Sequence, residues 1–190
     1  MKKILIFNAN PKLSSFCRSL TSVYLENVSQ DHSVEVIHIS DLDFEMNLKE
    51  GYDQIKALEP DLVKFQEKLL WADHVVFISP VWWGAMPSKF KALIDRTFLP
   101  GFAFKYEEGK TIPKKLLSGR TAELIITLDT PVWWYKIFQG QPILTMLKHT
   151  ILEFVGIKVI RHTYFGPLIS SKESQREAWK KKVESIARKQ

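Results

Sequence analysis

Short apolar runs alternate with amphipathic segments from one end of the chain to the other, and this alternation restricts the fold most strongly. Residues 4–7 and 75–78 are continuous apolar runs, as expected for central strands of a parallel sheet that is covered on both faces. Residues 34–39, 122–126 and 158–165 also have strand character, and helix-like segments separate all five runs. The sequence therefore predicts an α/β three-layer sandwich, with a five-stranded parallel sheet and helices on both of its faces.

Local signals mark the ends of the predicted helices, and residues 41–59 read as a long polar loop. These signals are an N-cap at Ser14 or Ser15, helix starts near Pro60, Pro87 and Pro142, a C-cap at Gly156, and a capping box at residues 170–173. The predicted buried faces are Phe16, Leu20, Val23 and Tyr24; Leu62, Phe65 and Leu69; Phe90, Leu93, Ile94 and Phe98; Leu144, Leu147, Ile151 and Phe154; and Trp179, Val183 and Ile186. In the helix after Pro87, Lys89, Lys91, Asp95 and Arg96 fall off the apolar face and are expected in solvent.

The composition is that of an ordinary globular protein. A length of 190 residues lies within the ~100–200 expected of one domain, so we expect residues 1–190 to form a single domain. The only cysteine is Cys17, which excludes an internal disulfide and a cysteine-rich metal site and fits a reducing compartment. The first apolar run ends at Asn8, too early for a signal peptide, and no stretch is long enough to span a membrane. We expect a cytoplasmic protein without a bound metal.

In both doubly wound strand orders common at this size, ligands bind at the carboxyl ends of the strands. The first such loop follows Phe7 and contains no glycine, so the dinucleotide fingerprint and the P-loop are both absent. It does place Ser14 and Ser15 at a helix N-terminus with Lys12 nearby, a combination suited to a phosphate. Taken alone, however, this loop favours an ordinary N-cap, because serines are common at helix starts.

The loops after the third and fourth predicted strands are rich in aromatic residues. Residues 79–87 hold Trp82 and Trp83 between prolines, and residues 127–135 repeat the theme with hydroxyls, an acid, a proline and three aromatics. Because loops lie at the surface, such a density indicates a flat aromatic ligand or a partner subunit. Neighbouring residues of an extended loop point in opposite directions, so we expect one of Trp82 and Trp83 to stack on a ligand and the other to pack on the protein.

The two motifs that make the sequence recognisable are PVWWGAMPSKFKALIDR at residues 80–96 and GFAFKY at residues 101–106. Together they resemble the flavodoxin-like NAD(P)H:quinone oxidoreductases. The first loop resembles that family's phosphate loop, and TLDTP at residues 127–131 resembles its third flavin loop. The resemblance covers nearly the whole chain in the same order. It implies the flavodoxin-like strand order 2-1-3-4-5.

By this resemblance the flavin-binding residues are Asn10, Ser15, Phe16 and Cys17 at the phosphate, Pro80, Val81, Trp82, Trp83 and Gly84 along the isoalloxazine edge, and Thr127, Leu128, Asp129 and Thr130 at the pyrimidine end. The resemblance also implies a homodimer in which Phe104 and Tyr106 match aromatics that one protomer lends to the other's substrate pocket. Tyr135 matches a tyrosine that steadies charge on the reduced flavin. The implied reaction is ping-pong: NAD(P)H reduces the flavin and leaves, and a quinone or similar acceptor, such as an azo or nitro compound, takes its place.

The chain departs from the family pattern at the proton-handling residue. No histidine lies between Thr127 and Gln141, and we interpret His149 and His162 as structural because neither has a visible catalytic partner. The family also commonly has a histidine where Asn10 stands. The chain is shorter than the FAD-binding members, which favours FMN, with FAD as the alternative.

Two other functions are compatible with the same fold. An electron-carrier flavodoxin would bind flavin without being an enzyme, but such carriers are usually acidic, whereas this chain has a net charge of +6. A cytosolic regulatory subunit of a membrane transporter is the second alternative. Nucleic-acid binding is not expected because the basic residues are scattered and no recognition motif occurs. A hydrolase is not expected because there is no G-x-S-x-G elbow. Membrane insertion is not expected either.

Overall fold

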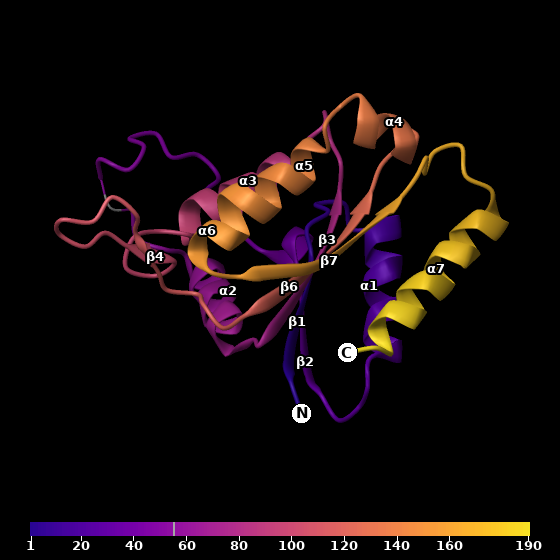
Figure 1. Cartoon of the computed structure of the whole chain (residues 1–190), viewed down its shortest axis with the longest axis horizontal. Coiled ribbons are helices and arrows are strands. Elements are labelled where there is room, and N and C mark those ends of the chain that lie inside the picture. The colour runs from indigo at the N-terminus through magenta and orange to yellow at the C-terminus, as the bar shows by residue number, and fades with distance from the viewer. Residues whose placement is uncertain (55) are drawn as a thin grey trace.

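A computed structural model of the protein describes residues 1–54 and 56–190. Five parallel strands form one sheet in the order β2-β1-β3-β6-β7, which confirms the predicted sheet and its strand order. Figure 1 shows helices on both sides of this sheet, in the three layers expected. The strands are β1 (Lys3–Asn8), β2 (Ser33–His38), β3 (His74–Pro80), β6 (Thr121–Thr127) and β7 (Lys158–Phe165).

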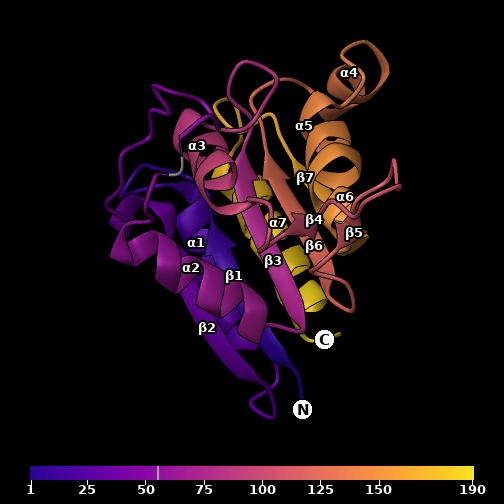
Figure 2. The same cartoon turned by 90° about the vertical axis from the view of Figure 1, so that its left-hand side faces the viewer.

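The alternation of side chains along each strand divides the core in two. Leu5 and Phe7 of β1 pack into a cluster beneath the helices on one face, while Ile4 and Ile6 pack against those on the other. Figure 2 views the sheet from the face that carries most of the helices. These are α2 (Pro60–Trp71), α3 (Ser88–Thr97) and the helical segment 142–155, whereas α1 (Phe16–Asn27) and α7 (Glu173–Ala187) cover the opposite face.

The helical segment 142–155 differs from the prediction in its second half. It consists of α5 (Pro142–Thr145), η2 (Met146–Leu152) and α6 (Glu153–Val155), and η2 is wound as a π-helix. The wider winding delays the buried face by one residue, so that Leu152 and Val155 are buried instead of the predicted Ile151 and Phe154. Ile151 stays partly buried and Phe154 is exposed, whereas Gly156 caps the segment in the left-handed conformation as predicted.

Arg96 is a second correction, because its side chain is only 1% exposed despite lying off the apolar face of α3. Its guanidinium donates to the Glu59 carboxylate at 2.6 Å and to the main-chain oxygens of Glu45 and Ala57. These acceptors belong to the predicted loop 41–59, of which Ile55 lies outside the described residues. Arg96 thus holds a long irregular segment at three of its residues, in addition to the buried contacts of Leu42 and Phe44.

Four local features depart from the predictions. Residues 132–137, interpreted as part of a loop, form the short helix α4 (Val132–Ile137), and an unpredicted hairpin joins β4 (Phe104–Lys105) to β5 (Lys114–Lys115). A single 3-10 turn, η1 (Ile39–Asp41), follows β2. Helix α7 begins later than its predicted capping box, with Lys172 as N-cap, because the Ser171 hydroxyl donates instead to Leu168 O at 2.6 Å.

Both ends of the described chain lie at the amino-terminal edge of the sheet, at the bottom of Figure 1. Lys2 Nζ donates to the main-chain oxygen of Gln190 at 3.2 Å, so the two ends are neighbours. The opposite edge carries the loops that follow the strands. Among the described residues, no helix combines the length and apolar character needed to cross a bilayer.

Candidate functional site

The loops after β1, β3 and β6 meet at the carboxyl edge of the sheet, where the sequence predicted the site. Backbone hydrogen bonds join them in series: Ala9 N donates to Ile78 O at 2.8 Å, and Val81 N donates to Thr127 O at 2.7 Å. Leu128 N continues the series with a 3.0 Å bond to Phe165 O. The three loops therefore share one backbone framework, and a displacement of one alters the others.

The first loop presents the N-terminus of α1. Ser15 is its N-cap, and Ser15 Oγ accepts from Arg18 N at 3.2 Å, which leaves the hydroxyl proton available to a ligand. The amide N–H groups of Phe16 and Cys17 donate to no acceptor among the described residues, as expected at a helix start. Together with the helix dipole, these donors make the start of α1 chemically suited to an anion. Asn10, also predicted here, is buried and orders the loop by accepting from Lys12 N at 3.0 Å.

Cys17 and Thr127 lie beneath this surface and connect the first loop to the third. Cys17 Sγ lies 3.3 Å from Thr127 Oγ1, and both side chains are buried. Burial raises the pKa of the Cys17 thiol, and hydrogen bonds from Thr127 and Asn10 only partly offset this effect. The thiol is therefore neutral and inert at neutral pH, and Cys17 offers a ligand its backbone amide rather than its sulfur.

The second loop is a tight turn and not the extended loop assumed for Trp82 and Trp83. Trp82 N donates to Ala85 O at 2.9 Å and Ala85 N donates back to Trp82 O at 3.0 Å. Trp83 (φ 50°) and Gly84 (φ 79°) between them are both left-handed, as in a type I′ turn. A bulky residue in this conformation is strained, and strain of this kind concentrates at functional sites. Both indoles reach solvent, Trp83 completely, so neither is packed into the core.

A cleft with a volume of about 690 Å³ separates the second loop from the third. Gln139 and Pro142 form part of its wall, although Pro142 was predicted only as a helix start and no local signal marked Gln139. Pro80 is buried at the end of β3, and Trp82 stands outside the cleft. The rest of the lining consists of six residues that the sequence predicted, namely Val81, Trp83, Gly84, Leu128, Asp129 and Thr130.

Tyr135 lies behind the cleft and is fully buried. Its hydroxyl donates to Gly84 O at 2.9 Å and accepts from Ile143 N at 3.1 Å, so it braces the second loop against the start of α5. Burial raises the pKa of this phenol. With both hydrogen bonds made inside the protein, Tyr135 touches the site through Gly84; the role predicted for it on a reduced flavin stays a prediction.

Phe104 and Tyr106 are not brought to this cleft. Their rings meet edge to face at 5.5 Å on the β4–β5 hairpin, and they line a separate cleft beside Arg96 and Leu99. Within one chain they therefore form no part of the site. Their predicted contribution to a partner's pocket stays a prediction.

The arrangement suits a flat, anionic ligand. The N–H groups of Trp83 and Gly84 have no acceptor among the described residues, so the cleft offers backbone donors on one wall and the Trp83 indole as a stacking surface. The N-terminus of α1 lies at the same sheet edge. A planar heterocycle with a phosphate tail matches both features. Among the described residues no group of three or more histidine, cysteine or carboxylate side chains gathers around a point that a metal ion could occupy.

Comparison with known proteins agrees with this geometry across the whole chain. The family model described as Flavodoxin-like fold matches residues 2–189. Mouse ribosyldihydronicotinamide dehydrogenase [quinone] is 30% identical, over 97% of this chain and 92% of its own length. An FMN-dependent NADH:quinone oxidoreductase of Pseudomonas fluorescens is 29% identical, over 66% of this chain and 69% of its own length. The crystal structure of a Streptococcus mutans protein superposes with a TM-score of 0.79 at 28% identity, and the match covers 99% of this chain and 100% of the other.

Proposed function

Since the chain belongs to the flavodoxin-like family of NAD(P)H and quinone oxidoreductases, we propose that it binds a flavin in its strand-end cleft and passes hydride from NAD(P)H to a quinone or similar acceptor. The observation that carries the proposal is the pairing of that cleft with a helix N-terminus whose amide donors are free. Trp83 and the third loop would hold the ring, and the amides of Phe16 and Cys17 would bind its phosphate. FMN satisfies both parts of the site, and the name of the Pseudomonas fluorescens relative supports it; FAD is the alternative.

Residues of the chain have three tasks in this proposal. Ser15 and the amides of Phe16 and Cys17 bind the phosphate. The strained turn directs the N–H groups of Trp83 and Gly84 toward the ring heteroatoms, and the Tyr135 hydroxyl keeps that turn in place. The polar backbone and side chains of the third loop would bind the pyrimidine end of the ring. The protein thus supplies stacking, orientation and hydrogen-bond donors.

The flavin supplies the two-electron chemistry when bound, because it accepts hydride from one substrate and gives two electrons to another. NAD(P)H loses a hydride and becomes NAD(P)⁺; the quinone gains two electrons and two protons and becomes the hydroquinone, one proton coming from solvent. One open cleft serves both substrates in turn, so we propose ping-pong kinetics. The proposal includes a cytoplasmic homodimer in which Phe104 and Tyr106 of one protomer approach the other's cleft.

The first experiment identifies the cofactor. The purified protein is examined for flavin absorbance, the flavin is released by heat and identified by chromatography, and NADPH or NADH is added without oxygen. We expect FMN, bleaching by the nicotinamide, and recovery of colour when a quinone is added. A colourless protein that takes up neither FMN nor FAD contradicts the proposal, and bleaching without recovery contradicts the quinone step.

A charge placed at the phosphate site tests the proposed binding mode. Ser15→Asp keeps a side-chain oxygen that caps α1 but sets a negative charge against the phosphate, so FMN affinity falls at least about tenfold. Riboflavin, which has no phosphate, binds equally to both proteins. Ser22→Asp, on an exposed turn of the same helix, is the matched control. Equal loss of FMN and riboflavin binding in Ser15→Asp places the phosphate elsewhere.

A further inference from the structure

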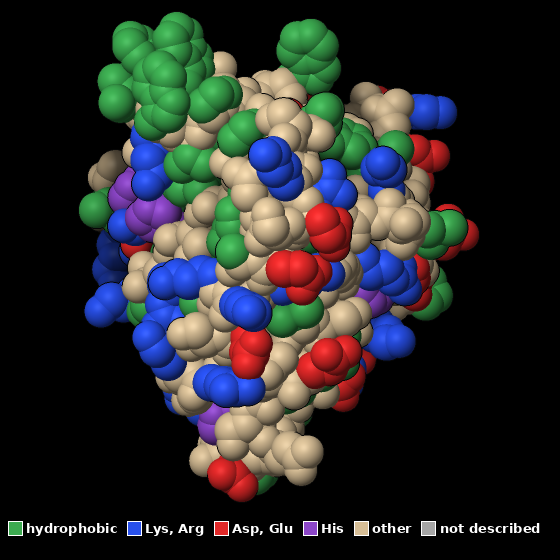
Figure 3. Space-filling model, turned by 90° about the vertical axis from the view of Figure 1, so that its right-hand side faces the viewer, with side chains coloured by type: hydrophobic (Ala, Val, Ile, Leu, Met, Phe, Trp, Pro, Cys, Tyr) green, Lys and Arg blue, Asp and Glu red, His purple; other side chains and the backbone are tan. Residues whose placement is uncertain are grey.

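Helix α4 carries a cluster of aromatic and aliphatic side chains that the rest of the protein does not cover. Trp133, Trp134, Ile137 and Phe138 are 59%, 43%, 71% and 63% exposed, and we call these four residues the aromatic knob. The indole of Trp134 stacks on the Phe138 ring at 4.3 Å, and Trp133 meets Trp134 edge to face at 5.7 Å. Figure 3 shows hydrophobic side chains protruding at the upper left of this face, over α4. A protruding apolar patch of this kind marks a contact surface.

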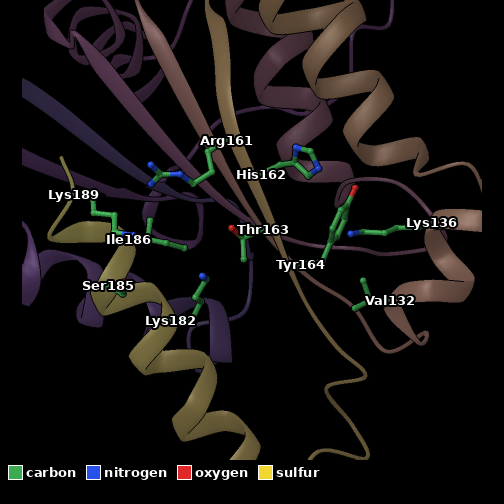
Figure 4. Close-up of a pocket in the computed structure, with 10 residues that line it drawn as sticks. All are labelled: Val132, Lys136, Arg161, His162, Thr163, Tyr164, Lys182, Ser185, Ile186 and Lys189. Carbon is green, nitrogen blue, oxygen red and sulfur yellow. The ribbon is translucent and has the colours of Figure 1, made fainter.

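A groove rich in cations lies beside the aromatic knob. It encloses about 440 Å³ between edge strand β7, helix α7 and helix α4, and no aspartate or glutamate lines it. Figure 4 shows Arg161 and Lys182 on the α7 side of β7 and Lys136 on the other side, beside the Tyr164 ring. We call Lys136, Arg161, Lys182 and Lys189 of this lining the basic groove.

The cations of the basic groove are largely uncompensated. Arg161 pairs with the buried Glu123 carboxylate at 3.4 Å. None of the ion pairs formed by the described residues involves Lys136, Lys182 or Lys189. Lys136 Nζ lies over the face of Tyr164, 5.2 Å from the ring centre. Three lysines around one groove therefore present a positive field to whatever docks on this face.

The aromatic knob and the basic groove form one continuous surface, because Lys136 stands within α4 and also lines the groove. We propose that this surface docks on the headgroup region of an anionic lipid bilayer. Tryptophan and phenylalanine side chains settle at the boundary between headgroups and acyl chains, and lysines beside them gain from the negative charge of the lipids. The proposed contact is peripheral: the protein lies on the bilayer surface. It needs no membrane-spanning helix, and none is found among the described residues.

Charge decides between a bilayer and a second copy of the chain. In a two-fold pair both copies use the same patch, which would bring two basic grooves together around the knobs at an electrostatic cost. A small free anion would be held by the groove and would leave the aromatic knob uncovered. An anionic bilayer satisfies the knob and the groove together.

The docking also indicates which class of electron acceptor the protein uses. This second inference, unlike the docking itself, rests on the proposed function. Helix α4 directly follows the third loop of the cleft, so the knob and the cleft share the carboxyl edge of the sheet. Docking through α4 sets the cleft beside the membrane, where lipophilic quinones dissolve. The acceptor class we infer is therefore a membrane quinone in preference to a water-soluble one.

Vesicle sedimentation tests the docking without using the redox reaction. The full-length protein, with and without added FMN, is spun with vesicles of equimolar phosphatidylglycerol and phosphatidylcholine, or of phosphatidylcholine alone. We expect binding to the anionic vesicles only, with a blue shift of tryptophan fluorescence. Trp133→Ser with Phe138→Ser, and Lys182→Glu with Lys189→Glu, each lower the vesicle affinity at least about tenfold.

Matched controls separate these effects from changes in folding or net charge. Lys64→Glu with Lys114→Glu changes the net charge equally on other elements, and Ile112→Ser removes an exposed apolar side chain from the β4–β5 connection; both bind vesicles like the wild type. Circular dichroism and FMN binding verify that the variants fold. Absence of wild-type binding to anionic vesicles overturns the docking, and so does a dimer that the knob variant dissociates without lipid. A protein that binds vesicles but no flavin refutes the proposed function and leaves the docking standing.

Discussion

The tetrapeptide Pro-Val-Trp-Trp occurs twice in this chain, at residues 80–83 and 131–134, and folds in two different ways. In the first copy the chain reverses in a tight turn, with Trp83 left-handed. In the second copy the same residues begin helix α4, and Trp134 is helical. The fifth residue makes the difference, because Gly84 completes the turn whereas Tyr135 enters the core and continues the helix. The backbone conformation of an identical tetrapeptide is thus decided by the residue that follows it and by that residue's tertiary contacts.

The two copies are also joined to each other. The residue that fixes the second copy, Tyr135, donates its hydroxyl proton to Gly84 O beside the first. The phenol oxygen of Tyr135 in turn accepts from Ile143 N at the start of α5. The Tyr135 hydroxyl therefore fixes the two copies relative to each other, from a position behind the cleft.

The largest expected effect comes from removing this link. Tyr135→Phe leaves Gly84 O and the buried Ile143 N without a partner, which lowers the free energy of unfolding by about 2–3 kcal/mol. Urea denaturation of the FMN-free protein measures the loss. Tyr106→Phe, at an exposed ring, is the control and changes stability by less than about 0.5 kcal/mol. Equal midpoints for the two variants would show that the copies fold independently.

A smaller effect is expected at the residue that separates the two conformations. Gly84→Ala has room for its methyl group, 3.6 Å from Pro142 Cγ, but the positive φ costs about 1–2 kcal/mol of stability. FMN affinity falls as well because the turn lines the cleft. Gly109→Ala, at φ 75° with open space around it, carries the same backbone cost. Titration with FMN distinguishes the two variants. An equal FMN affinity in both would show that the turn at Gly84 takes no part in FMN binding.

The smallest effects have opposite signs at the last tryptophan of each copy. Trp83→Gly relieves left-handed strain and raises stability by about 0.5 kcal/mol while weakening FMN binding. Trp134→Gly removes a helical residue that stacks on Phe138, and lowers stability by about 1 kcal/mol. Thermal melts of both variants without FMN provide the measurement. A decrease in both would mean that Trp83 is not strained.

Features that depend on local patterns were predictable from sequence. Buried strands appear as apolar runs, and Ser15 as an N-cap needs only its own helix. Six of the cleft residues followed from strand ends and from the family resemblance. Parallel strands bring their carboxyl ends to one edge whatever the loop sequences are, which is why the position of the candidate cleft could be predicted from sequence.

Features that depend on distant contacts were not predictable. Arg96 is buried because Glu59 and two carbonyl groups lie around it, and no helical pattern encodes partners 37 or more residues away. The π-wound segment moves burial from Phe154 to Val155 through packing on the sheet. Helix α4 replaced a predicted loop because Tyr135 finds two hydrogen-bond partners in the interior. In each case a tertiary contact overrode a sound local pattern.

The meeting of the chain ends at Lys2 and Gln190 has a practical consequence for electrochemistry. A linker attached at either end leaves from the edge of the sheet opposite the cleft, at the bottom of Figure 1. A molecule tethered in this way to an electrode or a bead turns its cleft and helix α4 outward, toward the solution. Both attachment points give nearly the same orientation, so an immobilised layer presents one face regardless of which end is used.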